Sequence, residues 1–150
     1  MEAPVPQPTI NQINLISDDF DSTIDFYRML GMQVRDPHHT PSGEPFHAEH
    51  QPQEGTMLEI DSASFARVWN RGWAGEDALN GRIVVGLSVS SRDEVDNLYR
   101  EATARGHRAL QEPYDAFWGA RYAVLEDPNG LAVGLMSPID EAYRSAPPSF

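Results

Sequence analysis

Apolar and polar residues follow two periods along this chain. A period of two, in which Ile13 and Leu15 alternate with Gln12 and Asn14, predicts a half-buried strand over residues 10–17. Helical spacing of apolar residues follows, and it stops at Gly31, a residue type that commonly ends helices. Three shorter strands and then a short amphipathic helix are expected next, over residues 32–36, 45–51, 56–61 and 62–70.

The second half of the chain shows the same order of elements. A strand is expected over residues 81–90 and a helix over residues 92–105, which Gly106 ends. The sequence Asp-Pro-Asn-Gly at 127–130 is typical of a tight turn, because proline presets the second position and glycine tolerates positive φ. The remaining strands are expected over residues 107–111, 118–126 and 131–136.

The two halves superpose with a single change of register. Before the first helix, equivalent residues lie 72 positions apart, as in Ile13–Val85 and Leu15–Leu87. From the glycine that ends this helix onward, the offset is 75, as in Gly31–Gly106, Gly55–Gly130 and Ile60–Leu135. One change at a helix end, after which the offset holds, is the pattern of an internal duplication. The sequence therefore predicts an α+β fold built from two βαβββ modules.

The modules fix the expected organisation of the chain. The first module takes residues 9–71, a glycine- and asparagine-containing linker takes residues 72–80, and the second module takes residues 81–138. Residues 1–8 and 139–150 contain several prolines and are expected to form an arm and a tail.

Composition excludes several classes of function. The 150 residues carry 11 basic side chains, all arginine, against 23 acidic ones, for a net charge of −12. Such a charge repels phosphate backbones, so we expect no nucleic-acid partner. Cysteine is absent, which excludes thiol nucleophiles and disulfides. No apolar run approaches the roughly 20 residues of a membrane span, and the first residues lack a signal-like pattern, so we expect a cytoplasmic protein.

Four short motifs stand in order within the repeat: Ile-Asn-Leu at 13–15, Phe-Tyr-Arg-Met-Leu-Gly at 26–31, Pro-Tyr-Asp-Ala-Phe-Trp-Gly at 113–119, and Glu-Asp-Pro-Asn-Gly at 126–130. Together they resemble the vicinal oxygen chelate superfamily, which contains glyoxalases, bleomycin-resistance proteins and extradiol dioxygenases. The resemblance covers about residues 9–138. It implies that the curled mixed sheets of the modules surround an open cavity, and that the protein is a homodimer.

The resemblance also points to four positions where metal-using relatives place ligands, on the first and last strand of each module. They fall here on Gln12, Glu59, Val84 and Gly134, of which the last two have no donor atom. A divalent ion needs several converging donors. We therefore expect no metal cofactor, as in the metal-free bleomycin-resistance-like members, with one divalent ion as the alternative.

The five histidines do not restore this ligand set in an obvious way. His47 and His50 are three apart on one expected strand and so face opposite sides, and the sequence places neither beside Glu59. His38 and His39 are expected in a loop, and the fifth histidine, at position 107, opens a strand.

Aromatic residues are the candidate ligand contacts. Tyr114, Phe117 and Trp118 gather near the sixth and seventh strands, and Trp69 and Trp73 lie near the linker. Flat aromatic walls suit planar ligands, and an acidic protein favours cationic ones. Each of these residues taken singly is more simply explained as ordinary core. Gln12, Asn14 and Glu59 supply polar contacts or merely line a wet surface, and Arg121 either neutralises an anionic ligand or pairs with Glu59.

These features favour a metal-independent protein that binds a small drug-like or natural-product-like molecule, aromatic or cationic, between two subunits, as in antibiotic resistance. The alternative is a divalent-metal-dependent lyase or dioxygenase whose atypical ligand set uses Glu59, Gln12 and a relocated histidine. A metal-free enzyme with a general base in the pocket is a third hypothesis. The sequence leaves catalysis open.

Overall fold

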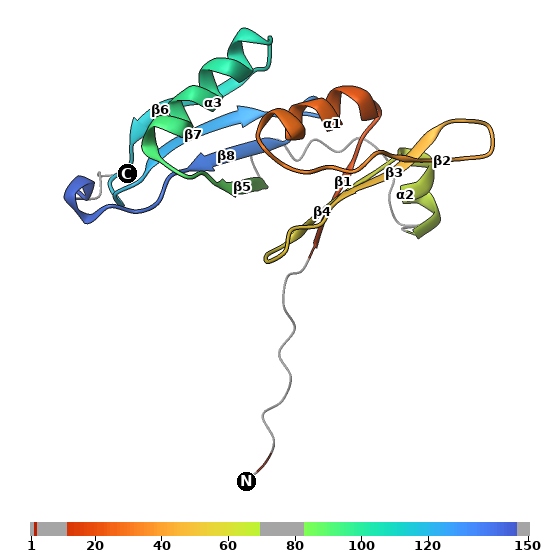
Figure 1. Cartoon of the computed structure of the whole chain (residues 1–150), viewed down its shortest axis with the longest axis horizontal. Helices are drawn as coiled ribbons and strands as arrows, with labels where there is room; N and C mark the ends of the chain where they lie inside the picture. The colour runs from red at the N-terminus through yellow and green to blue at the C-terminus, as the bar shows by residue number, and fades with distance from the viewer. Residues whose placement is uncertain (1, 3–11, 70–82, 147–150) are drawn as a thin grey trace.

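The computed structural model describes residues 2, 12–69 and 83–146, and Figure 1 shows how their elements are arranged. Apart from residue 2, the expected arm at 1–8 lies outside the described residues. So do the linker at 72–80, with Trp73, and the end of the tail at 147–150.

The first module is a four-stranded mixed sheet with the strand order β1-β4-β3-β2. The central strand β4 runs parallel to β1 and antiparallel to β3. Its elements are β1 (Gln12–Ile16), α1 (Phe20–Met29), β2 (His38–His39), β3 (Pro45–His50), β4 (Met57–Asp61) and α2 (Ala63–Trp69).

The second module repeats this topology with the order β5-β8-β7-β6. Again the last strand is central, parallel to the first and antiparallel to the third. Its elements are β5 (Val84–Ser88), α3 (Arg92–Ala104), β6 (Ala109–Asp115), β7 (Arg121–Glu126) and β8 (Ala132–Met136), followed by the 3₁₀ turn η1 (Glu141–Tyr143). The α+β class and the two βαβββ modules are thereby confirmed.

Equivalent polar residues begin the two long helices. The side chain of Asp19 accepts a hydrogen bond from the backbone N–H of Ser22, and that of Ser91 accepts from the N–H of Glu94. Each cap satisfies a backbone donor that the first helical turn leaves free. Both helices end at a glycine with positive φ, as the sequence predicts.

One continuous hydrophobic core joins the modules on the helix side of the sheets. Phe26 and Tyr27 of α1 are fully buried, and the Phe26 ring meets His107 of the second module edge to face at 4.8 Å. The Asn129 amide donates to Thr23 across the same boundary at 3.0 Å. Figure 1 shows α3 covering one face of the second sheet. In both sheets the residues that belong to the core alternate with residues that point to the opposite face.

The second strand lies later than the sequence predicts. Residues 32–36 contribute only a single bridge, between Val34 and His50, and the strand is His38–His39, which we expected to be a loop. Pro37 has no N–H to donate and interrupts the ladder between the two.

The sixth and seventh strands are also displaced from the expected ranges 107–111 and 118–126. Strand β6 starts two residues later and continues to Asp115, with irregular register on both sides of Gln111. It accommodates Pro113 because it is an edge strand. Strand β7 starts only at Arg121, so Trp118 lies in the turn between the two strands.

The expected tail is partly ordered against this turn. Asp140 N–H donates to the Gly119 carbonyl at 3.0 Å, and Ser145 N–H donates to the Phe117 carbonyl at 2.9 Å. None of the helices in residues 12–69 and 83–146 combines the length and apolar character that a membrane crossing requires.

Candidate functional site

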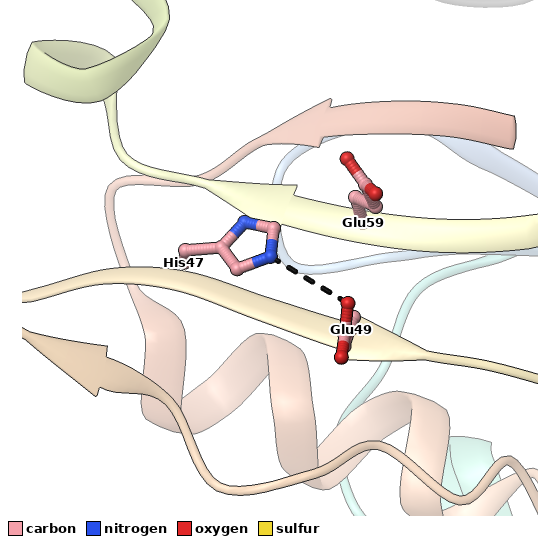
Figure 2. Close-up of side chains that lie close together, drawn as sticks. All are labelled: His47, Glu49 and Glu59. Carbon is pink, nitrogen blue, oxygen red and sulfur yellow. Dashed lines mark ion pairs between the residues drawn. The ribbon is translucent and has the colours of Figure 1, made fainter.

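The face of the first sheet opposite the hydrophobic core carries a group of polar side chains, which we call the polar face: Asn14, His47, Glu49, Glu59 and Asp61. Alternation along the strands points all five to the same side. The ladder then sets them next to one another, because Asn14 pairs with Glu59, Glu49 pairs with Glu59, and His47 pairs with Asp61. Figure 2 shows His47 and Glu49 of β3 pointing to the same side as Glu59 of β4.

His47 is held by a buried carboxylate. Its Nδ1 lies 2.7 Å from Oδ1 of Asp61, a side chain that is only 1% exposed. An ionised carboxylate only accepts hydrogen bonds, so Nδ1 is the ring nitrogen that donates in this pair. Nε2 is 3.8 Å from Oε2 of Glu49. The structure therefore points Nε2 of His47 toward Glu49 on the polar face.

Amide side chains of β1 support the carboxylates. The Asn14 amide donates to Glu59 Oε2 at 2.9 Å and to Asp61 Oδ2 at 3.1 Å, and the Gln12 amide donates to the Asn14 oxygen at 3.0 Å. Asn14, rather than Gln12, is thus the residue of β1 that contacts Glu59. The ladder explains this, since the partner of Gln12 in β4 is Met57.

His47, Glu49 and Glu59 each offer a donor atom, and these atoms lie within 4.8 Å of one another. Sequence reasoning placed no histidine beside Glu59, and the structure corrects this. The signal was the pattern His-x-Glu at 47–49, which puts both side chains on one face of a strand. His50 does face the other way, and its Nδ1 accepts from the Gln33 N–H at 3.0 Å.

The second sheet has no such donors at the equivalent positions. Gly134 pairs with Gly86, as Glu59 pairs with Asn14, and Val84 pairs with Ala132. A Cβ at Gly134 would lie 2.6 Å from the hydroxyl oxygen of Tyr122, so this ring fills the space beside the glycine.

An aromatic group covers this side of the second module, and we call it the aromatic face: Tyr114, Trp118 and Tyr122. The Trp118 ring meets Tyr122 at 5.6 Å and Tyr114 at 6.5 Å, and the two tyrosines meet at 6.1 Å, all edge to face. Tyr114 remains 37% exposed. Burial, and secondarily Tyr114, raises the pKa of the Tyr122 hydroxyl, so it stays a neutral donor.

Two further predicted ligand contacts are now placed. Phe117 packs edge to face on Trp118 at 5.2 Å, and so supports the aromatic face from the turn. Trp69, at the end of α2, is 46% exposed and belongs to the first module.

Arg121 does not approach Glu59. Its guanidinium pairs with Asp96 of α3 at 3.0 Å and with Asp115 at 3.2 Å, because Arg121 projects to the helix side of the sheet. The pairing with Glu59 allowed by the sequence is therefore wrong. Arg121 borders a hollow of about 270 Å³ that is lined by Asp96, Tyr99, Arg100, Glu112, Pro113 and Arg121.

Comparison with known proteins agrees with this architecture. The family model of the Glyoxalase/Bleomycin resistance protein/Dioxygenase superfamily matches residues 9–135. The chain belongs to this superfamily. None of the curated protein sequences matches it.

Solved structures of the superfamily share the fold. A glyoxalase/bleomycin resistance protein/dioxygenase from Nocardioides is 25% identical, with a TM-score of 0.66 over 98% of this chain and 92% of that one. A family enzyme from Burkholderia phytofirmans is 16% identical, with a TM-score of 0.70 over 87% and 98%. Lactoylglutathione lyase from Agrobacterium tumefaciens is 18% identical, with a TM-score of 0.59 over 89% and 96%.

Proposed function

We infer that this protein binds a small planar molecule, aromatic and cationic, in the manner of the bleomycin-resistance branch of its superfamily. The observation that carries this proposal is the aromatic face, where three rings stand edge to face and Tyr114 stays partly open to solvent. Aromatic contacts add roughly 0.5–1.5 kcal/mol each beyond the area they bury. A planar ligand that meets two rings therefore gains both affinity and orientation.

Charge selects among planar ligands. The net charge of −12 attracts cations, and the aromatic face adds cation–π attraction. With Arg121 committed to Asp96 and Asp115, its guanidinium is a poor receptor for an anionic ligand. These features support the cationic class over the anionic one. Sequestration of such a compound in the cytoplasm is the antibiotic-resistance role that we propose.

The proposal includes a homodimer. Ile83, just before β5, and Val84, its first residue, are each 45% exposed, and Trp69 and Tyr114 are also exposed apolar side chains. A second copy that covers apolar side chains such as these would remove them from water, which favours association. Association of two copies would give the aromatic face a second wall and enclose the ligand between subunits.

Ligand contact at the aromatic face needs no metal in this proposal. At the equivalent positions of the second module, Val84 and Gly134 offer no donor, and the Tyr122 ring occupies the space beside the glycine. Chelator-treated protein is therefore expected to bind the same ligands.

Ethidium, a planar aromatic cation, is a suitable probe, and its own fluorescence reports binding. We expect ethidium to bind more tightly than the planar anion anilinonaphthalene sulfonate, and Trp118→Ala to weaken ethidium binding about tenfold. Tyr143→Ala is the control, because this exposed ring lies under Arg92. Equal affinity of wild type and Trp118→Ala would remove the aromatic face from the binding site.

The second candidate function is a divalent-metal-dependent lyase or dioxygenase, favoured by the proximity of His47, Glu49 and Glu59. Three protein ligands leave coordination positions for a substrate oxygen. Assays with the methylglyoxal–glutathione hemithioacetal and with catechol test it. Turnover that chelation abolishes and metal restores would support an enzyme, and Glu59→Gln is then expected to remove it. Turnover unchanged in Glu59→Gln would count against it.

A further inference from the structure

We propose that the polar face is a binding site for one divalent transition-metal ion, with His47 Nε2 and the carboxylates of Glu49 and Glu59 as its protein ligands. Two of these ligands come from β3, a strand that contributes none of the four positions at which the resemblance places metal ligands. The site lies on the first module alone. It does not depend on ligand binding at the aromatic face, and either proposal can fail without the other.

Backbone register brings the donors together. His47 and Glu49 are two residues apart on β3, and Glu49 stands directly opposite Glu59 in the antiparallel ladder. Their donor atoms lie within 4.8 Å of one another. Donors about 2.1 Å from one tetrahedral ion lie about 3.4 Å apart. The donor atoms therefore have to approach one another by at most about 1.4 Å, a shift within reach of rotation of the long glutamate side chains, above all that of Glu49.

A buried carboxylate orients the histidine. Metal-bound histidines commonly donate their other ring N–H to a carboxylate, which fixes the tautomer and makes the ligand nitrogen more basic. Asp61 holds this position, with its Oδ1 2.7 Å from Nδ1 of His47, and it is only 1% exposed. Asn14 fixes the remaining oxygen of Asp61 and also holds Glu59. Both a ligand and its supporting carboxylate are thus anchored before any ion arrives.

Charge balance favours a cation at this place. Glu49, Glu59 and Asp61 bring three negative charges to one face, and in the described part of the chain the ion pairs supply a single guanidinium against them, Arg35 at 3.5 Å from Glu49. The Arg35 side chain is 67% exposed, so its charge is strongly screened. The three carboxylates therefore leave a net negative charge on this face, which a divalent ion would offset.

The donor set indicates the class of metal. One imidazole and two carboxylates suit Zn²⁺, which accepts both nitrogen and oxygen ligands, and the harder, oxygen-preferring Mn²⁺. With three protein ligands, at least one coordination position remains for water or for an oxygen of a bound molecule.

The test uses the full chain, stripped with a chelator and titrated with Zn²⁺ by calorimetry and with Mn²⁺ by electron paramagnetic resonance. We expect one ion per chain. His47→Gln and Glu59→Gln are expected to weaken metal binding at least about tenfold. Asp61 is not a ligand of the proposed site but orients His47, and Asp61→Asn is expected to weaken binding by about 10- to 100-fold. His50→Gln, on the opposite face of β3, and Glu126→Gln, on β7 of the second module, are matched controls that keep wild-type affinity.

A second readout covers variants that do not fold. In the wild-type protein, Mn²⁺ is expected to broaden the ring resonances of His47 at concentrations that leave those of His50 sharp. Absence of stoichiometric Zn²⁺ or Mn²⁺ binding would overturn the proposal. Wild-type affinity in folded His47→Gln and Glu59→Gln would overturn it equally, because the ion would then bind elsewhere. Ethidium binding to the chelated protein separates this outcome from failure of the proposed function.

Discussion

The hydroxyl of Tyr27 donates a hydrogen bond to Oδ2 of Asp127 at 2.9 Å. The bond crosses the boundary between the modules and joins residues that are 100 positions apart in the sequence. Both side chains are buried. Burial, and then the charge of Asp127, raises the pKa of the Tyr27 hydroxyl far above its ordinary value, so it remains a donor. Asp127 also accepts from the backbone N–H groups of Asn129 and Leu131. The turn of one module is thereby fixed to the first helix of the other.

Tyr27→Phe is expected to lower the free energy of unfolding by about 1.5–3 kcal/mol, because it removes a hydrogen bond to a buried charged acceptor. Tyr99→Phe is the matched control, since Tyr99 is the equivalent residue of the second module and only half-buried. In Tyr99→Phe the free energy of unfolding is expected to fall by less than about 0.5 kcal/mol. Chemical denaturation measures both, and equal losses would show that this hydrogen bond does not join the modules.

The free energy of unfolding is expected to decrease as the pH is lowered, because of His107. Burial in the folded state, and then Arg105, lowers the pKa of His107 below its ordinary value. The unfolded chain therefore takes up this proton first as the pH falls. The contribution of His107 to the free energy of unfolding is fully present above the pKa of the unfolded chain, about 6.5. It is lost as the pH falls from that value toward the lower pKa of the folded state.

His107→Phe is expected to remove this component, since it keeps an aromatic ring against Phe26 and cannot take up a proton. Urea midpoints between pH 7.5 and 5 are the measurement. A variant as sensitive to pH as wild type would assign the loss to other groups.

Gly134→Ala is expected to displace the Tyr122 ring, because the new methyl group would lie 2.6 Å from its hydroxyl oxygen and 3.1 Å from ring carbons. A cost of about 1–3 kcal/mol in stability is expected for such overpacking, together with weaker ethidium binding. Gly86→Ala is the control. Gly86 is the ladder partner of Gly134, and a Cβ there meets nothing within 4 Å. Similar effects of the two variants would place Tyr122 elsewhere.

Arg121→Gln is expected to lower stability by only about 0.5–1 kcal/mol, since its ion pairs with Asp96 and Asp115 are partly exposed. Ethidium affinity is expected not to change, because the guanidinium lies on the helix side of the sheet. Thermal unfolding and the ethidium titration together check this. A change in affinity without a change in stability would return Arg121 to the binding site.

The repeat and the glycines that end the long helices were readable from the sequence because they are periodic or local. The offset between the halves predicts the topology, and Gly31 and Gly106 mark the ends of the two helices. Strand β6 was harder to place, because its bulges and Pro113 are tolerated only at a sheet edge.

The polar face depends on a relation that no local pattern contains. The spacing of His47 and Glu49 shows that they share a face, but their distance to Glu59 is set by the register of β3 against β4. That register depends on the connection between the strands. In the same way, the ion pairs of Arg121 depend on how α3 packs on its sheet.

The hydrophobic core and the bond between Tyr27 and Asp127 lie on the helix side of the sheets, whereas the polar and aromatic faces lie on the other side. The shared core and the two proposed binding faces thus occupy opposite surfaces of the same strands. Substitutions at exposed positions of these faces are therefore expected to cost less folding free energy than substitutions in the core, and the faces of the two halves can diverge independently. A combinatorial library restricted to these two faces is a practical starting point for giving this scaffold new ligands.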